Sequence, residues 1–217
     1  MGRNPTLGYV APFIVYVALL SLPLPPILAH AIRFAITAAV IVFLSRPFLN
    51  LRPSYPLASV GIGIAVFLIW IGPDVLFGYR HHWLFENRLL GKAATSVTPS
   101  LEHSALFLTL RMLTSAALVP ILEELFWRGW LMRWLIDSRD SRKVPLGAYQ
   151  PFAFWMVAVL FAAEHGSYWE VGLLAGIAYN WWAVRTKSLA DCILAHAVTN
   201  AVLGIYVIAA GQWQYWL

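Results

Sequence analysis

Apolar residues fill most of the chain in long runs, which short polar, Pro-containing or Arg-containing stretches separate. A run of about 20 apolar residues makes a helix long enough to cross the hydrocarbon core of a bilayer. Membrane strands would instead give short segments of alternating polarity. The pattern therefore predicts an all-α, polytopic transmembrane bundle of about seven helices, with six to eight as the range. The predicted segments are Tyr9–Leu22, Ile27–Ser45, Leu57–Phe77, Ser104–Leu135, Pro151–His165, Val171–Val184 and Leu189–Ala210.

Composition excludes the soluble classes of protein. Of the 217 residues, 60% are hydrophobic and only 12% are charged, whereas a soluble domain has about 25% charged residues. Intrinsic disorder is excluded as well, because it requires low hydrophobicity. The chain shows no internal repeat and no low-complexity tract, so we expect a single integral membrane domain over residues 1–217.

The net charge of +5 does not indicate a nucleic-acid partner, because Lys and Arg lie at the ends of apolar runs and form no basic block. If all seven segments span, nine basic residues lie on one side and three on the other. The positive-inside rule then places the N-terminus inside and the aromatic tail Trp213–Trp216 outside. The nine are Arg3, Arg46, Arg52, Arg133, Arg139, Arg142, Lys143, Arg185 and Lys187, and the three are Arg80, Arg88 and Lys92.

Ionisable residues inside the apolar segments are informative, because a charge near the bilayer centre costs at least about 2.5–3.5 kcal/mol. In the fourth segment, Glu124 and Arg128 are four residues apart and share a helix face, so they can pair. Glu123 lies about 100° around the helix from Glu124 and lacks that local partner, a position that suits a general base. Pro120 should kink the helix just before it. The structural alternative, a buried Glu–Arg pair that locks two helices, does not account for Glu123.

Two further segments place polar groups at helical spacing. Phe161 and His165 share a face at the end of the fifth segment, and His196 and Asn200 share one in the seventh. Each pair has a structural alternative, since a lone His at a helix end is often an interface residue and a His–Asn strip can join helices by hydrogen bonds. Asp191 fits a capping box at the start of the seventh segment, which gives it a structural role.

The depths of these residues agree. At about 1.5 Å of rise per residue, Glu123, His165 and Asn200 each lie about 20–22 Å from the cytoplasmic end of their segments. His196 lies about one turn closer to that end. Independent structural pairs would have no reason to coincide in depth, so we expect these four side chains to meet in one catalytic cavity.

A carboxylate, two imidazoles and an amide in such a cavity favour hydrolysis. Glu123 with His165 can hold and deprotonate a water, and His196 and Asn200 can donate hydrogen bonds to the oxyanion. Cys192, one turn before His196, suggests a Cys–His pair, although an apolar helical cysteine is more often a packing residue. Glu, His and His are also zinc-type ligands, but we expect a mechanism without metal or cofactor.

Three short motifs lie in order on three separate apolar segments: Glu123-Glu124-xxx-Arg128, Phe161-xxx-His165 and His196-xxx-Asn200. Together they resemble the motifs of the CAAX protease and bacteriocin-processing family (CPBP), also called the Abi family. Its members are intramembrane endopeptidases and include the type II CAAX prenyl endopeptidases. The resemblance covers roughly residues 118–203, within a motif-bearing part at about 104–210.

By that resemblance, Glu123 is the catalytic Glu and His165 its water-holding partner, while His196 and Asn200 serve the oxyanion. Supporting roles are implied for Glu124 and Arg128. Size and layout also resemble a bacterial CAAX protease-related subgroup associated with exosortase systems. This implies a multi-pass protein of the bacterial cytoplasmic (inner) membrane.

Two hypotheses follow for the function. The first is an intramembrane hydrolase, a glutamate-dependent endopeptidase whose partners are a peptide or membrane-protein substrate and the lipid bilayer. The second is a non-catalytic membrane protein, such as a bacteriocin-immunity or protein-sorting partner, in which the same residues bind a ligand. The first is favoured because every motif residue is intact.

Overall fold

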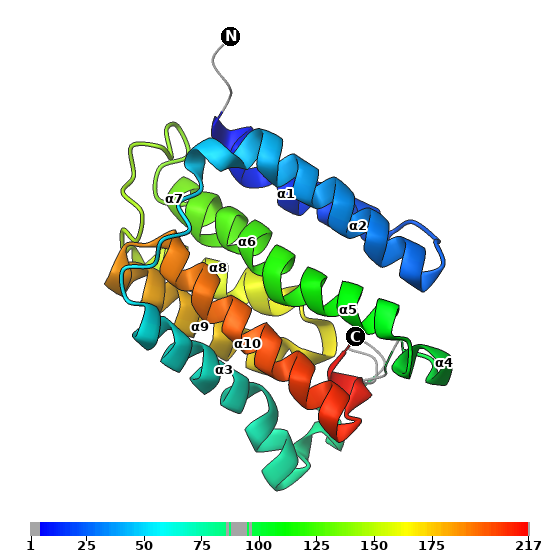
Figure 1. The fold of residues 1–217 in the computed structure, drawn as a ribbon. Coiled ribbons are helices and arrows are strands. Elements are labelled where there is room, and N and C mark those ends of the chain that lie inside the picture. Colours follow the sequence, from blue (N-terminus) through cyan, green and yellow to red (C-terminus); the bar gives the residue numbers. More distant parts are fainter. Residues whose placement is uncertain (1–4, 86, 88–94, 96, 217) are drawn as a thin grey trace.

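The computed structural model describes residues 5–85, 87, 95 and 97–216. The regular elements of these residues are helices (Figure 1), as the apolar runs predict. The α-helices are α1 Pro5–Leu20, α2 Pro26–Val40, α3 Pro56–Phe77, α4 Pro99–Glu102, α5 Ala105–Leu113, α6 Val119–Glu124, α7 Met132–Trp134, α8 Pro151–Ala163, α9 Trp169–Thr186 and α10 Leu189–Ala210. Short π and 3₁₀ elements are η1 Ile41–Ser45, η2 Arg46–Phe48, η3 Tyr79–His81, η4 Thr114–Leu118, η5 Leu125–Leu131, η6 Gly166–Tyr168 and η7 Trp213–Tyr215.

Four of the helices are long and apolar enough to cross a membrane: Pro26–Phe48, Pro56–Phe77, Ala105–Trp134 and Leu189–Ala210. Each coincides with one of the predicted apolar segments. The predicted helical membrane bundle is therefore confirmed, and the chain is an integral membrane protein.

The arrangement of the helices brings distant parts of the sequence together. The helices α1 and α2 lie side by side along one edge, followed by the long helix from α5 to α7 (Figure 1). Helix α10 packs against α3, and α8 against α9. These contacts are close, since a Cβ on Gly63 of α3 would overlap Ala195 and Val198 of α10.

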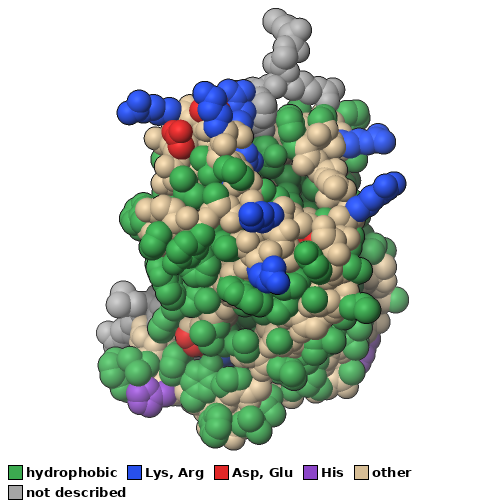
Figure 2. Space-filling view, turned by 90° about the vertical axis from the view of Figure 1, so that its left-hand side faces the viewer, with side chains coloured by type: hydrophobic (Ala, Val, Ile, Leu, Met, Phe, Trp, Pro, Cys, Tyr) green, Lys and Arg blue, Asp and Glu red, His purple; other side chains and the backbone are tan. Residues whose placement is uncertain are grey.

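Both kinds of surface expected of a membrane protein are present. Lys and Arg side chains gather at the upper end of the face in Figure 2, while the rest of that face is mainly hydrophobic. Large apolar side chains such as Leu57 and Phe77 are exposed along the helices, where lipid tails would cover them. Of the basic residues counted above, Arg3, Arg88 and Lys92 lie outside the described residues.

The helix from α5 to α7 is irregular around the acidic pair. Helical structure continues through Pro120, with the π-helical segment η4 before it and a second π-helical segment, η5, after Glu124. A proline has no N–H to continue the α-helical ladder, and single π turns inside α-helices are frequent at functional sites.

Asp191 is structural, as predicted, but its partners differ from those of a capping box. Ser188 caps α10 by accepting a hydrogen bond from the main-chain N–H of Asp191 at 3.3 Å. The Asp191 carboxylate instead accepts from the N–H groups of Ser54 and Tyr55 and from the Ser59 hydroxyl, at 2.7–2.8 Å. It therefore fixes the loop before α3 to the start of α10.

Candidate active site

One cavity of about 190 Å³ is lined by all four side chains for which we predicted catalytic roles. Glu123 comes from α6, His165 from the turn after α8, and His196 and Asn200 from α10. Up to 77 residues separate these side chains in the sequence, and the bundle brings them to this one cavity. Other lining residues are Trp70, Arg111, Ser115, Val119, Phe161, Ala175, Tyr179, Thr199, Leu203, Tyr215 and Trp216.

Glu124 and Arg128 lie behind the cavity and do not line it. Both are fully buried, and Arg128 Nη1 donates to Glu124 Oε1 at 3.0 Å. The same oxygen lies 2.9 Å from His196 Nδ1. Two more groups on Arg128 donate to Asn180 Oδ1 at 2.9 Å and to the Gly176 carbonyl at 3.3 Å. The pair therefore ties α9 and α10 to the helix that carries Glu123.

This contact determines which atoms of His196 face the cavity. With Nδ1 directed at Glu124, Nε2 lies on the other side of the ring, 3.9 Å from Glu123 Oε2. The ring is stacked on Tyr179, with a centroid distance of 5.0 Å. Glu123 Oε2 is buried and has no hydrogen-bond partner among the described residues, so it is available to a water or a substrate group.

His165 is oriented by the helix it follows. Its Nδ1 lies 2.6 Å from the Phe161 carbonyl oxygen. A carbonyl oxygen only accepts, so Nδ1 carries the hydrogen, and Nε2 of the neutral ring is left as an acceptor. The rings of Trp70 and Phe161 hold the imidazole at centroid distances of 5.2 and 4.7 Å. Gly172 of α9 gives the ring room, because a Cβ there would lie 3.1 Å from it.

Asn200 is held by an unusual main-chain acceptor. In the π-helical register of η4, Val119 N–H donates to the Thr114 carbonyl, five residues earlier. The next donor in this register would be Pro120, which has no N–H. The Ser115 carbonyl therefore stays available, and Asn200 Nδ2 donates to it at 2.8 Å. Pro120 thus helps to position a side chain on another helix.

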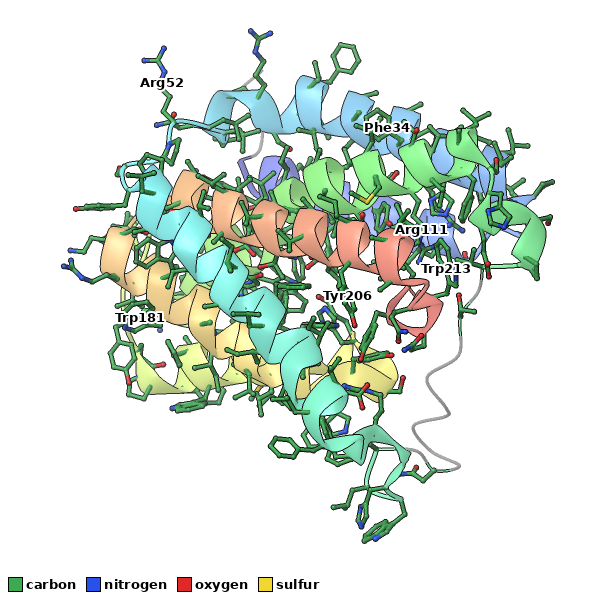
Figure 3. All side chains as sticks on the ribbon, turned by 60° about the horizontal axis from the view of Figure 1, so that its bottom comes forward. Phe34, Arg52, Arg111, Trp181, Tyr206 and Trp213 are labelled. Atoms are coloured by element: carbon green, nitrogen blue, oxygen red, sulfur yellow. The ribbon has the colours of Figure 1, made fainter. Side chains whose placement is uncertain are left out.

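Several cavity residues were missed from the sequence. Arg111 on α5 lines the cavity and lies near the tail after α10 (Figure 3), with its guanidinium 4.9 Å from the Trp216 ring centre. An arginine inside an apolar segment is itself a signal, so Arg111 could have been found. Tyr179, which lines the cavity, and Asn180, which binds Arg128 behind it, carry no such signal, because both lie within the short apolar segment predicted at Val171–Val184.

Two alternatives considered from the sequence were a Cys–His pair and a metal site. Cys192 is fully buried and is not among the residues that line the cavity. Its Sγ lies 3.8 Å from the Tyr179 carbonyl, a contact typical of a packed thiol. In the part of the chain that the structure describes, no group of three or more His, Cys, Asp or Glu is arranged to hold a metal ion.

Comparison with known proteins identifies one family. Residues 105–202 match the model of a family described as type II CAAX prenyl endopeptidase Rce1-like. This stretch holds all seven motif residues named above. No curated protein and no solved structure matches the chain. The resemblance to the CAAX protease family is thereby confirmed, and over residues 105–202 this membrane protein is similar to the Rce1-like members of that protease family.

Proposed function

We propose that the protein is an intramembrane endopeptidase that hydrolyses a peptide bond with a water activated by Glu123 and His165. One observation carries the proposal: Glu123, His165, His196 and Asn200 line a single cavity within a bundle of apolar helices. Similarity to the protease family over residues 105–202 supports hydrolysis in general, and the geometry supports these roles.

The acceptors in the cavity suit a bound water. Glu123 Oε2 and the acceptor nitrogen Nε2 of His165 can each receive one hydrogen of the same water molecule, which leaves an oxygen lone pair for attack. The water oxygen bonds to the substrate carbonyl carbon, and its proton passes to Glu123. When the tetrahedral intermediate collapses, the C–N bond breaks, and Glu123 returns the proton to the leaving amine.

The donors lie on α10. Asn200 uses one amide hydrogen to bind the Ser115 carbonyl, and its second amide hydrogen is available for the oxyanion. His196 donates from Nε2 when its ring is doubly protonated, with Nδ1–H bound to Glu124. Such donors, fixed before the reaction, stabilise the charge that develops on the carbonyl oxygen.

The first prediction concerns the general base. Glu123→Gln keeps the size of the side chain but removes the carboxylate that accepts the proton. We expect cleavage of a quenched-fluorescent peptide library by the purified protein to fall by about 10²–10⁴-fold, with folding unchanged. Glu102→Gln, on α4 and outside the cavity, is the matched control. Unchanged cleavage by Glu123→Gln, or no cleavage by the native protein, would support a non-catalytic binding protein instead.

The second prediction concerns metal. Because the water is held by protein acceptors in this mechanism, incubation with 1,10-phenanthroline or EDTA should leave the cleavage rate within about twofold. The cleavage rate is measured before the chelator is added, in its presence and after its removal. Complete loss of activity, restored by adding Zn²⁺, would replace this mechanism with a zinc-dependent one.

A further inference from the structure

A second cavity lies at the opposite end of the bundle from the tail after α10. Its volume is about 410 Å³, and we call it the basic pocket. It lies where the loop before α3, the end of α7, the loop before α8 and the start of α10 meet. The lining residues are Tyr9, Phe48, Asn50, Arg52, Ser54, Arg133, Leu146, Lys187, Ser188, Leu189 and Ala190.

The pocket carries three cations, Arg52, Arg133 and Lys187, and no carboxylate lines it. No carboxylate among the described residues forms an ion pair with any of the three. The nearby carboxylate of Asp191 is turned toward the loop before α3, where it accepts three hydrogen bonds. The positive charge of the pocket is therefore unbalanced by protein groups.

Arg133 is fixed in the pocket before any ligand binds. Its Nε, Nη1 and Nη2 donate to the main-chain oxygens of Val144, Gly129 and Arg142 at 2.7, 3.0 and 3.0 Å. These acceptors orient the guanidinium without cancelling its charge. Arg52 extends from the loop before α3 (Figure 3), and no protein partner of its side chain is seen in the described structure. Two further cations beside this fixed guanidinium form a site for an anion.

Neutral polar groups complete the polar side of the pocket. Asn50 Oδ1 accepts the N–H of Arg52 at 3.0 Å, so its amide hydrogens remain as donors. Ser54 and Ser188 also line the wall. Charged and neutral donors in one place match the several acceptor oxygens of a phosphate group.

The remaining wall is apolar. Tyr9, Phe48, Leu146 and Leu189 line the pocket. Beside it, Leu51 is exposed on the loop that carries Arg52. A site with cations at one side and apolar side chains at the other fits an amphiphile better than a free ion.

We infer that the basic pocket binds the phosphate group of an anionic phospholipid, whose acyl chains lie against the adjoining apolar surface. The pocket lies among most of the basic helix ends, as is typical of headgroup sites between transmembrane helices. The lipid would join the loop before α3 to α7 and α10, far from the catalytic cavity. This inference does not depend on the proposed peptidase activity.

Native mass spectrometry of the full chain, delipidated in detergent and then supplied with phosphatidylglycerol or phosphatidylcholine, tests the inference. We expect one retained phosphatidylglycerol per chain and weaker retention of phosphatidylcholine. The double variant R52Q/K187Q should lower the affinity for phosphatidylglycerol by about 30-fold, since each basic group near a lipid surface contributes roughly fivefold. Arg133 is left unchanged because its hydrogen bonds also hold the loop before α8.

The matched control is R46Q/R185Q, which removes two exposed cations outside the pocket at the same end of the bundle. It should keep the affinity within about twofold. Equal retention of the two lipids, or an equal loss in both double variants, would overturn the inference. Displacement of the lipid by inorganic phosphate at the same concentration would indicate a free-phosphate site and would also overturn it.

Discussion

Asn200 and Pro120 lie on different helices and are connected through one main-chain oxygen. The π-helical register before Pro120 leaves the Ser115 carbonyl without a main-chain donor, and Asn200 supplies the missing hydrogen bond. A residue that usually weakens a helix thus orients an amide toward the cavity. The cost of the missing backbone bond is offset by the side-chain bond.

A change of Pro120 to Ala separates helix stability from catalysis. The new N–H can donate to the Ser115 carbonyl and displace Asn200. We expect thermal stability in micelles to stay equal or rise, because Ala favours helix over Pro, while kcat falls by about 10–100-fold through a misplaced oxyanion donor. The variant Asn200→Ala should lose activity too, and the double variant should be no worse than Asn200→Ala alone. Additive losses in the double variant would show that Pro120 acts independently of Asn200.

At the scale of elements, the turn that carries His165 is supported by a buried ion-pair cluster. Arg80, after α3, donates to the Ser167 carbonyl at 3.2 Å and lies 4.0 Å from the centre of the Tyr168 ring. It also contacts Asp74 at 3.4 Å and Glu170 at 3.0 Å. The cluster therefore joins the end of α3 to η6 and the start of α9.

Two tyrosine hydroxyls complete this cluster. Tyr79 donates to Glu170 and Tyr215 to Asp74, at 2.8 and 2.7 Å. Burial and the hydrogen bond to Glu170 raise the pKa of Tyr79 above its ordinary value. A raised pKa means that the stabilisation is complete below the unfolded value of about 10 and is lost only at higher pH. Ionisation of the Tyr79 hydroxyl therefore does not change the stability of this cluster across the neutral pH range.

Replacing Arg80 by Gln should destabilise the fold more than it alters the cavity chemistry. The change leaves the partly buried carboxylates of Asp74 and Glu170 without their cation, which costs up to about 3 kcal/mol. We expect a clear fall in the unfolding temperature, measured by intrinsic tryptophan fluorescence in micelles. Arg80→Lys should recover part of it. A variant Arg80→Gln with native stability would mean that the cluster is hydrated and contributes little.

The helices could be predicted from the sequence because the length and the ends of each apolar run give the length and the ends of a helix. It also predicted that three motifs would meet, since residues three or four apart share a helix face wherever the helix packs. The π turns around Pro120 were not predicted, because they depend on competition between main-chain and side-chain donors from another helix. The carboxylate of Asp191 likewise bonds to residues more than 130 positions away.

For the whole molecule, the helix ends separate the chain into a basic end and an opposite end with the Arg80 cluster. The basic pocket and the exposed side chains of Arg46 and Arg185 belong to the first. The positive-inside rule, applied to these two ends, predicts an inside N-terminus. The orientation in the membrane remains a prediction.

Single introduced cysteines can test the orientation, because the one native cysteine, Cys192, is fully buried. Ser138→Cys lies on the loop after α7, and Trp83→Cys replaces a side chain that is 68% exposed at the opposite end. We expect a membrane-impermeant maleimide to label Trp83→Cys in intact spheroplasts and Ser138→Cys only in inverted vesicles. The reverse pattern would place the N-terminus outside. Labelling of the native chain would show that Cys192 is accessible.

The length of α8 has a consequence for how water enters the site and how the products of the proposed hydrolysis leave it. Thirteen residues extend about 20 Å, so the helix ends about 10 Å short of the far side of a hydrocarbon core of about 30 Å. The polar main chain of the turn after it needs hydration or protein cover at that depth. In the proposed reaction, a hydrated recess there would shorten the route for the hydrolytic water and would let the newly formed ammonium and carboxylate ends leave toward the same aqueous phase. The side of the membrane that receives the cleaved peptide would then be set by where this one helix stops.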